Sequence, residues 1–387
     1  MKAPPDPEPA LREEFNPSER SQVAATVTIA ATYAYFLIFA QFGFLKALAG
    51  LGSGNALLRP VLAVMAVAGI GGGVFMARWF RENRGRGQVM TGFVVSAIAA
   101  GLTWLARSPG EFFLAAALTG AGTGMVTVGL VGLLRREVGG GRLGRCIGIG
   151  TGVAYAFCNL PPIFGGAAHT QAMLGIAAAC TGLIAVQLFE QRGPRQHTSG
   201  YDYTSGGKAV WTVIFLALVC LDSAAFYIIQ HTPALRLATW AGGPRLLLNA
   251  GVHLVAGVAA GFLLERRWIA GAVGGAAVLL ITACALLDQG SGRFSLEAGL
   301  YAAAVSVYSV ALVFYPARSG RPGLAALVYA VAGWTGSALG VGLAQKLERV
   351  PAGLIAASAM AIAAMFVVRH RGRRRREAPG GVKTGGF

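Results

Sequence analysis

The chain has 387 residues, of which 55% are hydrophobic and only 13% are charged. A soluble domain carries roughly a quarter charged residues, so this composition excludes a soluble globular fold. The 33 lysines and arginines outnumber the 16 aspartates and glutamates. In a soluble protein such an excess of positive charge would indicate a nucleic-acid partner, but this chain is not of that class. Continuous apolar runs of about twenty residues instead predict an all-α polytopic membrane protein, because a spanning helix needs that length and a barrel strand only about ten.

Twelve membrane-spanning helices are predicted, in two sets of six separated by the longest polar connection. In chain order the first set covers 22–47, 56–80, 88–106, 111–134, 143–164 and 171–189, and the second covers 209–229, 244–264, 268–287, 296–315, 324–343 and 351–368. This division predicts a cytoplasmic N-terminal tail (1–21), an N-terminal six-helix bundle (22–189), a cytoplasmic linker (190–208), a C-terminal six-helix bundle (209–368) and a basic cytoplasmic tail (369–387).

The positions of the basic residues predict the orientation, since lysine and arginine resist translocation across the membrane. With both termini in the cytoplasm, 25 of the 33 lie on the cytoplasmic side and 8 on the other. The positive charge is therefore a topology signal, and no nucleic-acid partner is predicted. Arginine outnumbers lysine 28 to 5, as expected of a GC-rich bacterium. We predict a multi-pass protein of the inner (cytoplasmic) membrane whose partners include membrane lipids.

No sequence pattern points to a metal ion, a cofactor or a hydrolytic site. The five cysteines form no CxxC or CxxCH pair, and the chain has no Walker loop, no HExxH and no GxSxG. Metal sites, covalent haem, nucleotide hydrolysis and the commoner hydrolase reactions need such spacings. We therefore predict no metal, no cofactor and no enzymatic activity.

The two sets of helices repeat with a nearly constant offset along the chain. Gly73 corresponds to Gly257, a shift of 184, and Arg136 corresponds to Arg318, a shift of 182. Parallel six-helix repeats related by an axis along the membrane normal are typical of major facilitator transporters. The sequence resembles this superfamily across its whole membrane region.

Two local motifs contribute to the resemblance. Residues 78–86 are similar to the family's Gly-x-x-x-Asp-Arg-x-Gly-Arg loop: Gly85 and Arg86 match, whereas Glu82 and Asn83 replace the usual Asp and Arg. Glycines and prolines between 148 and 166 are similar to the family's antiporter motif in the fifth helix. The resemblance implies a central path between two bundles, lined by the first, fourth, seventh and tenth helices.

Two ionisable side chains lie about halfway along consecutive predicted helices, Asp222 in the seventh and His253 in the eighth. Such groups are costly within a bilayer and tend to face a cavity or a partner. A carboxylate beside an imidazole changes protonation near neutral pH, so the pair is predicted to couple transport to protons. The alternative is a hydrogen bond that only holds the two helices together.

Polar and aromatic side chains near the middle of several predicted helices indicate a binding site for a small organic solute with an apolar or aromatic part. At the outer boundary, Lys46 and Arg59 either extend to the interface or bind an anion. The predicted substrate-binding residues are Tyr33, Tyr35, Gln41, Thr123, Tyr155, Asn159, Tyr227, Asn249, Tyr308 and Trp334.

Together these observations predict a monomeric secondary active transporter that moves a small organic solute by alternating access, coupled to protons. Because a carboxylate can also serve sodium, the sequence leaves sodium open as the coupling ion, and it leaves the direction of transport open as well. One alternative is a carrier-like subunit or assembly factor that does not transport. The altered loop motif and the few charges inside the membrane segments favour it. A polytopic membrane enzyme is a third possibility, but it would need a cluster of polar groups at an interface that the sequence lacks.

Overall fold

The structure of the chain is a computed structural model that describes residues 18–52, 54–138, 141–190, 207–289, 294–345 and 347–377. All regular secondary structure within these ranges is helical. Among these described residues, eleven helices are long and apolar enough to cross a membrane, and Leu143–Cys158 is a shorter apolar helix. The predicted fold class, an all-α multi-pass membrane protein, is confirmed. Residues 1–17, 191–206 and 378–387, which make up most of the predicted tails and linker, lie outside the described residues.

The helices of the first half follow the predicted order. They are α1 (Glu19–Ala34), η1 (Tyr35–Gly43), α2 (Phe44–Ala49), α3 (Gly54–Trp79), η2 (Glu82–Arg84), α4 (Gly85–Leu105), α5 (Pro109–Val138), α6 (Leu143–Cys158), α7 (Pro161–Phe164) and α8 (Ala168–Gln187). The first predicted span is therefore the continuous run of α1, η1 and α2, in which η1 is a π-helix.

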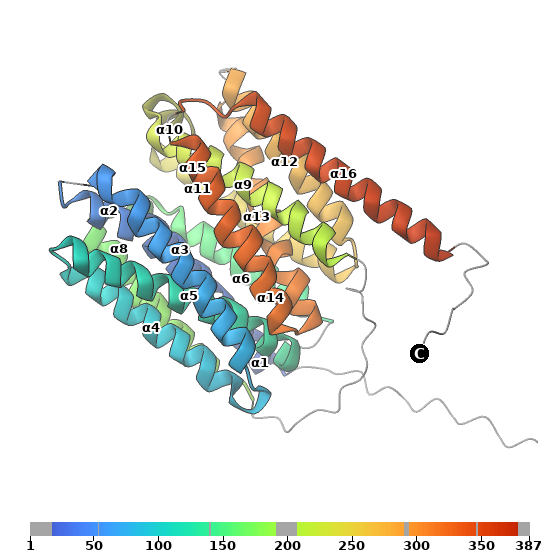
Figure 1. Cartoon of the computed structure of the whole chain (residues 1–387), viewed down its shortest axis with the longest axis horizontal. Helices are drawn as coiled ribbons and strands as arrows, with labels where there is room; N and C mark the ends of the chain where they lie inside the picture. Colours follow the sequence, from blue (N-terminus) through green and yellow to red (C-terminus); the bar gives the residue numbers. More distant parts are fainter. Residues whose placement is uncertain are drawn as a thin grey trace, which may run out of the picture.

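The second half repeats this plan. Its helices are α9 (Lys208–His231), α10 (Pro233–Thr239), α11 (Gly243–Glu265), α12 (Ile269–Gln289), α13 (Phe294–Ser319), α14 (Pro322–Val328), η3 (Tyr329–Thr335), α15 (Gly336–Ala344) and α16 (Ala352–Glu377). In Figure 1, α3, α4, α5 and α8 lie on one side of the bundle, and α9, α12, α13 and α16 lie on the other.

The fifth predicted span differs from the structure because its helix breaks before its expected end. The predicted span covers 143–164, whereas α6 ends at Cys158 and the short helix α7 starts at Pro161. Proline has no amide hydrogen to donate and disfavours a helical conformation in the residue before it. Leu160 is accordingly extended, with φ −65° and ψ 130°.

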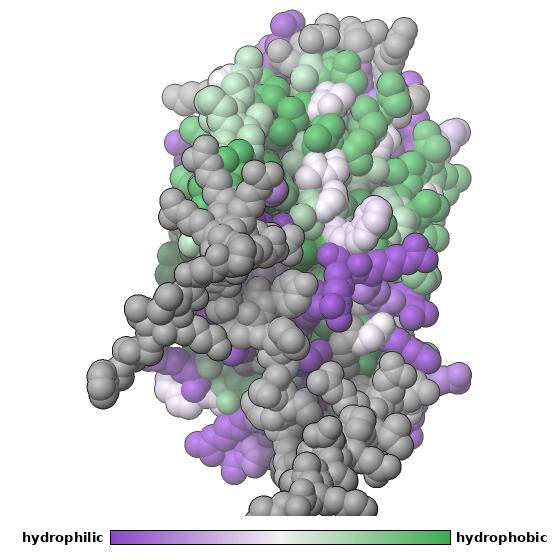
Figure 2. Space-filling view, turned by 90° about the vertical axis from the view of Figure 1, so that its right-hand side faces the viewer, coloured by the Kyte–Doolittle hydropathy of each residue, from purple (hydrophilic) through white to green (hydrophobic). Residues whose placement is uncertain are grey.

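The bundle is apolar outside as well as inside. Aromatic side chains such as Phe39, Phe93 and Phe314 are fully buried, whereas Val67 is 70% exposed and Val255 is 69% exposed. Figure 2 shows a broad hydrophobic surface in the upper part of the view and hydrophilic side chains below it. This distribution suits a protein whose surroundings along most of its length are lipid.

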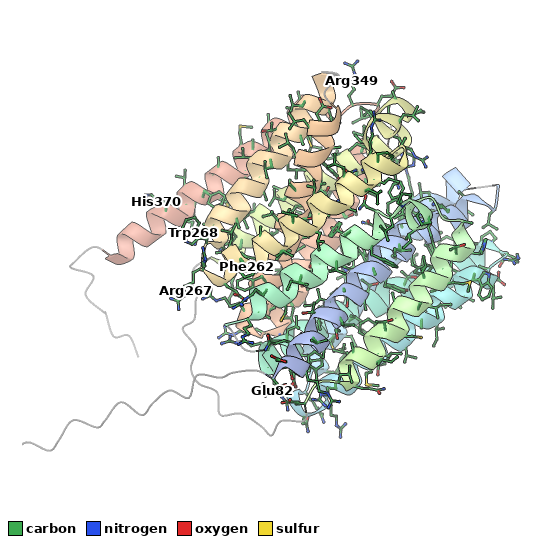
Figure 3. The ribbon with its side chains drawn as sticks, turned by 180° about the vertical axis from the view of Figure 1, so that it is seen from behind. Glu82, Phe262, Arg267, Trp268, Arg349 and His370 are labelled. Atoms are coloured by element: carbon green, nitrogen blue, oxygen red, sulfur yellow. The ribbon has the colours of Figure 1, made fainter. Side chains whose placement is uncertain are left out.

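The two ends of the bundle differ in charge. Glu82 and Arg267 lie toward one end in Figure 3, and Arg349 lies at the other. We call the first the basic end. It carries Arg78, Arg81, Arg84, Arg86, Arg135, Arg136, Arg142, Arg145, Arg266 and Arg267. The opposite end carries Lys46, Arg59, Arg107, Arg236, Arg245 and Arg349.

Candidate functional site

A cavity of about 1020 Å³ lies between the two halves of the bundle. Its wall comes from α1, η1, α2, α3, α5, α6 and α7 in the first half, and from α9, α10, α11, α13, η3 and α15 in the second. The structure brings ten of the twelve predicted site residues to this wall. They are Tyr33, Gln41, Thr123, Tyr155, Asn159, Asp222, Tyr227, His253, Tyr308 and Trp334.

Asp222 lies in the middle of α9 and is held by two tyrosines of α13. The hydroxyl of Tyr301 donates a hydrogen bond to Oδ1 of Asp222, and the hydroxyl of Tyr308 donates one to Oδ2. Among the residues that the structure describes, no lysine or arginine forms a salt bridge with this carboxyl group. Its charge is therefore balanced by hydrogen bonds alone, so the binding of a proton is a direct way to neutralise it.

His253 has partners of its own. Nδ1 of its ring and Oγ of Ser306 share a hydrogen bond of 2.7 Å. The ring also stacks on Tyr155, with centroids 4.7 Å apart and an angle of 18° between the planes. The expected carboxylate–imidazole pair is therefore not formed in this structure: Asp222 and His253 line one cavity but are hydrogen-bonded to different residues of α13.

A small hydrogen-bond network crosses from one half to the other beside these groups. The hydroxyl of Tyr33 on α1 donates to the carbonyl oxygen of Ser309 on α13 over 3.2 Å. The hydroxyl groups of Tyr155 on α6 and Ser309 lie 3.1 Å apart. The rings of Tyr33 and Tyr155 are 5.8 Å apart between centroids. Since these bonds join the two halves, any movement of one half against the other has to rearrange them.

Two predicted binding residues, Tyr35 and Asn249, lie outside the cavity wall. The hydroxyl of Tyr35 donates to the carbonyl oxygen of Ser96 on α4 over 2.9 Å, and the amide of Asn249 donates to that of Thr239 over 3.2 Å. Their side chains are 3% and 2% exposed. Tyr35 connects η1 to α4 within the first half, and Asn249 connects α11 to α10 within the second. Neither residue therefore belongs to the candidate binding site.

Sequence reasoning missed several residues of the site. Tyr301 lies seven residues before Tyr308, so the two tyrosines are two helical turns apart on one face of α13. This spacing is visible in the sequence and could have identified Tyr301. Ser306 and Ser309 are also on α13, where single serines in an apolar helix stand out little. Tyr329 reaches the wall from η3 in the eleventh span.

Four aromatic side chains gather in the cavity wall on the side of the opposite end. The ring of Phe42 lies 5.2 Å from that of Phe164 and 5.7 Å from that of Phe226. Trp240 lies 6.0 Å from Phe164 and 5.2 Å from Phe226. Because Phe42 and Phe164 belong to the first half and the other two to the second, this aromatic cluster also bridges the halves. No sequence pattern connects these four positions.

Toward the basic end, α6 of the first half and α11 of the second are in direct contact. A Cβ atom added to Gly148 would lie 2.5 Å from the carbonyl oxygen of Gly257, so the two backbones touch. One turn closer to the basic end, Nε of Arg145 lies 2.7 Å from Oε2 of Glu265 and forms an ion pair. The lining residue Val131 is also fully buried on this side.

The cavity is accessible from the opposite end. Arg59, His231 and Arg236 belong to its lining and are exposed on the surface. In this structure the cavity is thus accessible from the opposite end, whereas the two halves touch toward the basic end.

No protein-family model and no curated protein matches this sequence. Several solved structures share its fold. The human organic anion transporter MFSD10 (TETRAN) is 13% identical, with a TM-score of 0.64 over 92% of this chain and 100% of that one. The proton:xylose symporter XylE is 13% identical, with a TM-score of 0.65 over 91% and 95%. The E. coli fucose:proton symporter FucP is 13% identical, with a TM-score of 0.59 over 90% and 98%. The chain thus has the fold of the major facilitator superfamily.

Proposed function

We propose that this chain is a secondary active transporter that moves a small organic solute by alternating access and couples the movement to protons. The observation that carries the proposal is the cavity of about 1020 Å³ between the halves, with the hydrogen-bonded Asp222 in its wall and one closed end. The similar structures are named as transporters of organic anions, xylose and fucose, the last two together with protons. Their likeness supports transport in general and leaves the solute of this chain to experiment.

The size of the cavity favours transport over the alternative of a carrier-like subunit. Binding sites for small organic ligands have volumes of about 300–1,000 Å³ and combine apolar walls with a few polar groups. The cavity reaches the upper end of that range, and its polar groups come from both halves. A subunit with a purely structural role has no need for such a space.

Asp222 is the proposed proton carrier. When ionised, its two oxygens accept hydrogen bonds from the Tyr301 and Tyr308 hydroxyls. When the group is protonated, one oxygen carries a hydrogen that it can donate, and this oxygen becomes a weaker acceptor for its tyrosine. That tyrosine hydroxyl is then available to the solute, because Tyr301 and Tyr308 both line the cavity. In this way the protonation state of one carboxyl group changes which hydrogen bonds the cavity offers.

Alternating access then requires the two ends to exchange roles. Opening the basic end separates α6 from α11 and breaks the ion pair between Arg145 and Glu265. Closing the opposite end tightens the aromatic cluster around Phe42 and Phe226, which already touches across the halves. In the proposed orientation, both termini and the basic end face the cytoplasm in the inner membrane of a bacterium, and the chain acts as a monomer.

The proposal is tested by reconstituting the chain in liposomes. A solute is first selected from a metabolite library by its effect on the thermal unfolding of the purified chain. Asp222→Asn is expected to abolish accumulation driven by a pH gradient and to retain exchange of labelled for unlabelled solute, which needs no net proton movement. Glu111→Gln, which changes an exposed carboxylate at the start of α5, is the matched control and should behave like the wild type.

The two parts of the proposal fail differently. Undiminished accumulation by Asp222→Asn would remove this residue from proton coupling but leave transport. A chain that binds its solute tightly and neither accumulates nor exchanges it would remove transport itself and favour the carrier-like subunit.

A further inference from the structure

Three basic side chains line the mouth of the cavity at the opposite end. Lys46 of α2 and Arg59 of α3 come from the first half, and Arg236 of α10 comes from the second. Among the described residues of the lining, Asp222 is the sole acid, and it lies in the middle of α9 rather than at the mouth. A concave entrance lined by one sign of charge attracts ions of the other sign and repels its own.

Lys46 is oriented by backbone carbonyl groups. Its Nζ donates hydrogen bonds to the carbonyl oxygens of Phe164, over 3.2 Å, and Gly166, over 2.9 Å. An ammonium group has three hydrogens to donate, so one remains for a ligand. The side chain is half-buried and lines the cavity. It is therefore held at the cavity wall instead of extending along the helix to the membrane interface.

The basic side chains lie next to the aromatic cluster. Lys46 follows Phe42 by four residues, and Trp240 follows Arg236 by four residues, so each pair is about one helical turn apart. Phe42 and Trp240 both belong to the cluster of rings that also contains Phe164 and Phe226. From the surface inward, a ligand thus meets positive charge first, then aromatic rings, then Asp222 with its tyrosines.

From this order of groups we infer that the solute is an organic anion with an aromatic or apolar body, and that protonation of Asp222 promotes its binding. The inference rests on the proposed function and names its substrate class. A carboxylate or similar head group would contact Lys46 and Arg236, with Arg59 contributing to the attraction. The body of the solute would lie against the aromatic cluster.

The anion also has a role in closing the opposite end. Closure moves Lys46 and Arg59 of one half toward Arg236 of the other, in a space that loses water as it narrows. Like charges repel more strongly when the surroundings are less polar. A bound anion offsets this repulsion, so the loaded carrier closes more readily than the empty one.

The coupling to protons follows from the shared cavity. Ionised Asp222 repels an anion in the same low-polarity space, and its protonation removes that repulsion. By linkage, a bound anion favours the protonated form to the same extent. The titratable groups that interact with this carboxyl group are Tyr301 and Tyr308 on α13, Tyr155 on α6 and Cys284 on α12. His253 on α11 and Tyr329 in η3 line the same cavity.

The test uses three probes with one shape and different charge: naphthoate, naphthylmethanol and naphthylmethylammonium. Their binding to the purified full chain is measured by calorimetry at about pH 5.5 and about pH 8, where a carboxylic acid stays ionised in solution. We expect naphthoate to bind about tenfold more tightly than the alcohol and the ammonium probe to bind least, because charge-assisted contacts at a half-buried site are strong.

The variants separate charge from shape. Lys46→Gln and Arg236→Gln are each expected to weaken naphthoate binding about fivefold and to leave the alcohol unchanged. Arg107→Gln is the matched control, since this exposed arginine lies at the same end but not in the cavity lining. Asp222→Asn should bind naphthoate at alkaline pH as tightly as the wild type does at acidic pH.

The substrate class is overturned if the three probes bind equally, if the ammonium probe binds best, or if naphthoate does not bind. A pH dependence that persists in Asp222→Asn and disappears in His253→Gln overturns the role given to the carboxyl group. The proposed transport function and the inferred substrate class can fail independently of each other. Selective binding of the anion without any exchange in liposomes removes the proposed function alone, whereas uptake limited to neutral or cationic solutes removes this inference alone.

Discussion

Gly148→Ala is expected to open the basic end of the cavity. A Cβ at this position would lie 2.5 Å from the carbonyl oxygen of Gly257, whereas ordinary contact begins at 3.4 Å, so α6 and α11 must part by about 0.9 Å. Overpacking of this kind costs about 1–3 kcal/mol. The cost applies only to the state in which the two helices touch. A change of about 2 kcal/mol shifts the ratio of two conformations about thirtyfold.

The assay uses a single cysteine introduced by Ser337→Cys, because Ser337 lines the cavity and is only half-buried. The five natural cysteines are replaced by alanine, and a membrane-impermeant thiol reagent is added to one side of oriented vesicles at a time. In the wild type, labelling should proceed from the opposite end and be slow from the basic end. Gly148→Ala should raise the rate from the basic end, because a larger fraction of molecules is open there.

The control is Gly251→Ala on α11, where an added Cβ would meet no atom within 4 Å. It changes helix composition equally without touching the interface between the halves. Both variants are first checked for an intact thermal unfolding transition. Equal labelling rates from the basic end in Gly148→Ala, Gly251→Ala and the wild type would refute the idea that contact between α6 and α11 closes the cavity.

Three further predictions concern individual contacts. Reversing the charge of either Arg145 or Glu265 should raise the labelling rate from the basic end, with an effect of about 1 kcal/mol, because the arginine of this ion pair is largely exposed to solvent. Exchanging both charges should restore the original rate, and a double variant that labels as fast as the single variants would contradict a role for the pair. Ser306→Ala should lower the unfolding free energy by about 1–3 kcal/mol in denaturant titrations, because it removes the partner of the buried His253 ring, and unchanged stability would contradict this. Tyr35→Phe should cost about 1 kcal/mol of stability and leave solute affinity unchanged; weaker binding by this variant would return Tyr35 to the binding set.

The order and approximate bounds of the spanning helices were predictable, because hydropathy depends on composition over a length of about twenty residues. The fifth span shows the limit of that reasoning. Its apolar run continues to residue 164, but α6 ends at Cys158, since the break depends on the backbone of Leu160 and Pro161 and not on hydropathy. The π-helical turns in η1 and η3 are likewise invisible to a hydropathy count.

The candidate site was only partly predictable. Depth along a helix identified Asp222 and His253, because position along a spanning helix follows from the residue count. The residue count does not give the rotation of the helix about its axis, which decides which side chains face the cavity. Tyr35 therefore ended outside the cavity although Tyr33, two residues earlier, lines it.

The sequence by itself determined the class of protein, the number and order of the apolar segments and the presence of an acid deep in the seventh, because each is a property of one stretch of chain. The tertiary structure alone decided that Tyr301 and Tyr308 hold Asp222, that Ser306 instead of the acid holds His253, and that four distant aromatic residues meet. These are contacts between helices far apart in the chain. They depend on how each helix is rotated and how closely glycines let two backbones approach, which no single segment encodes.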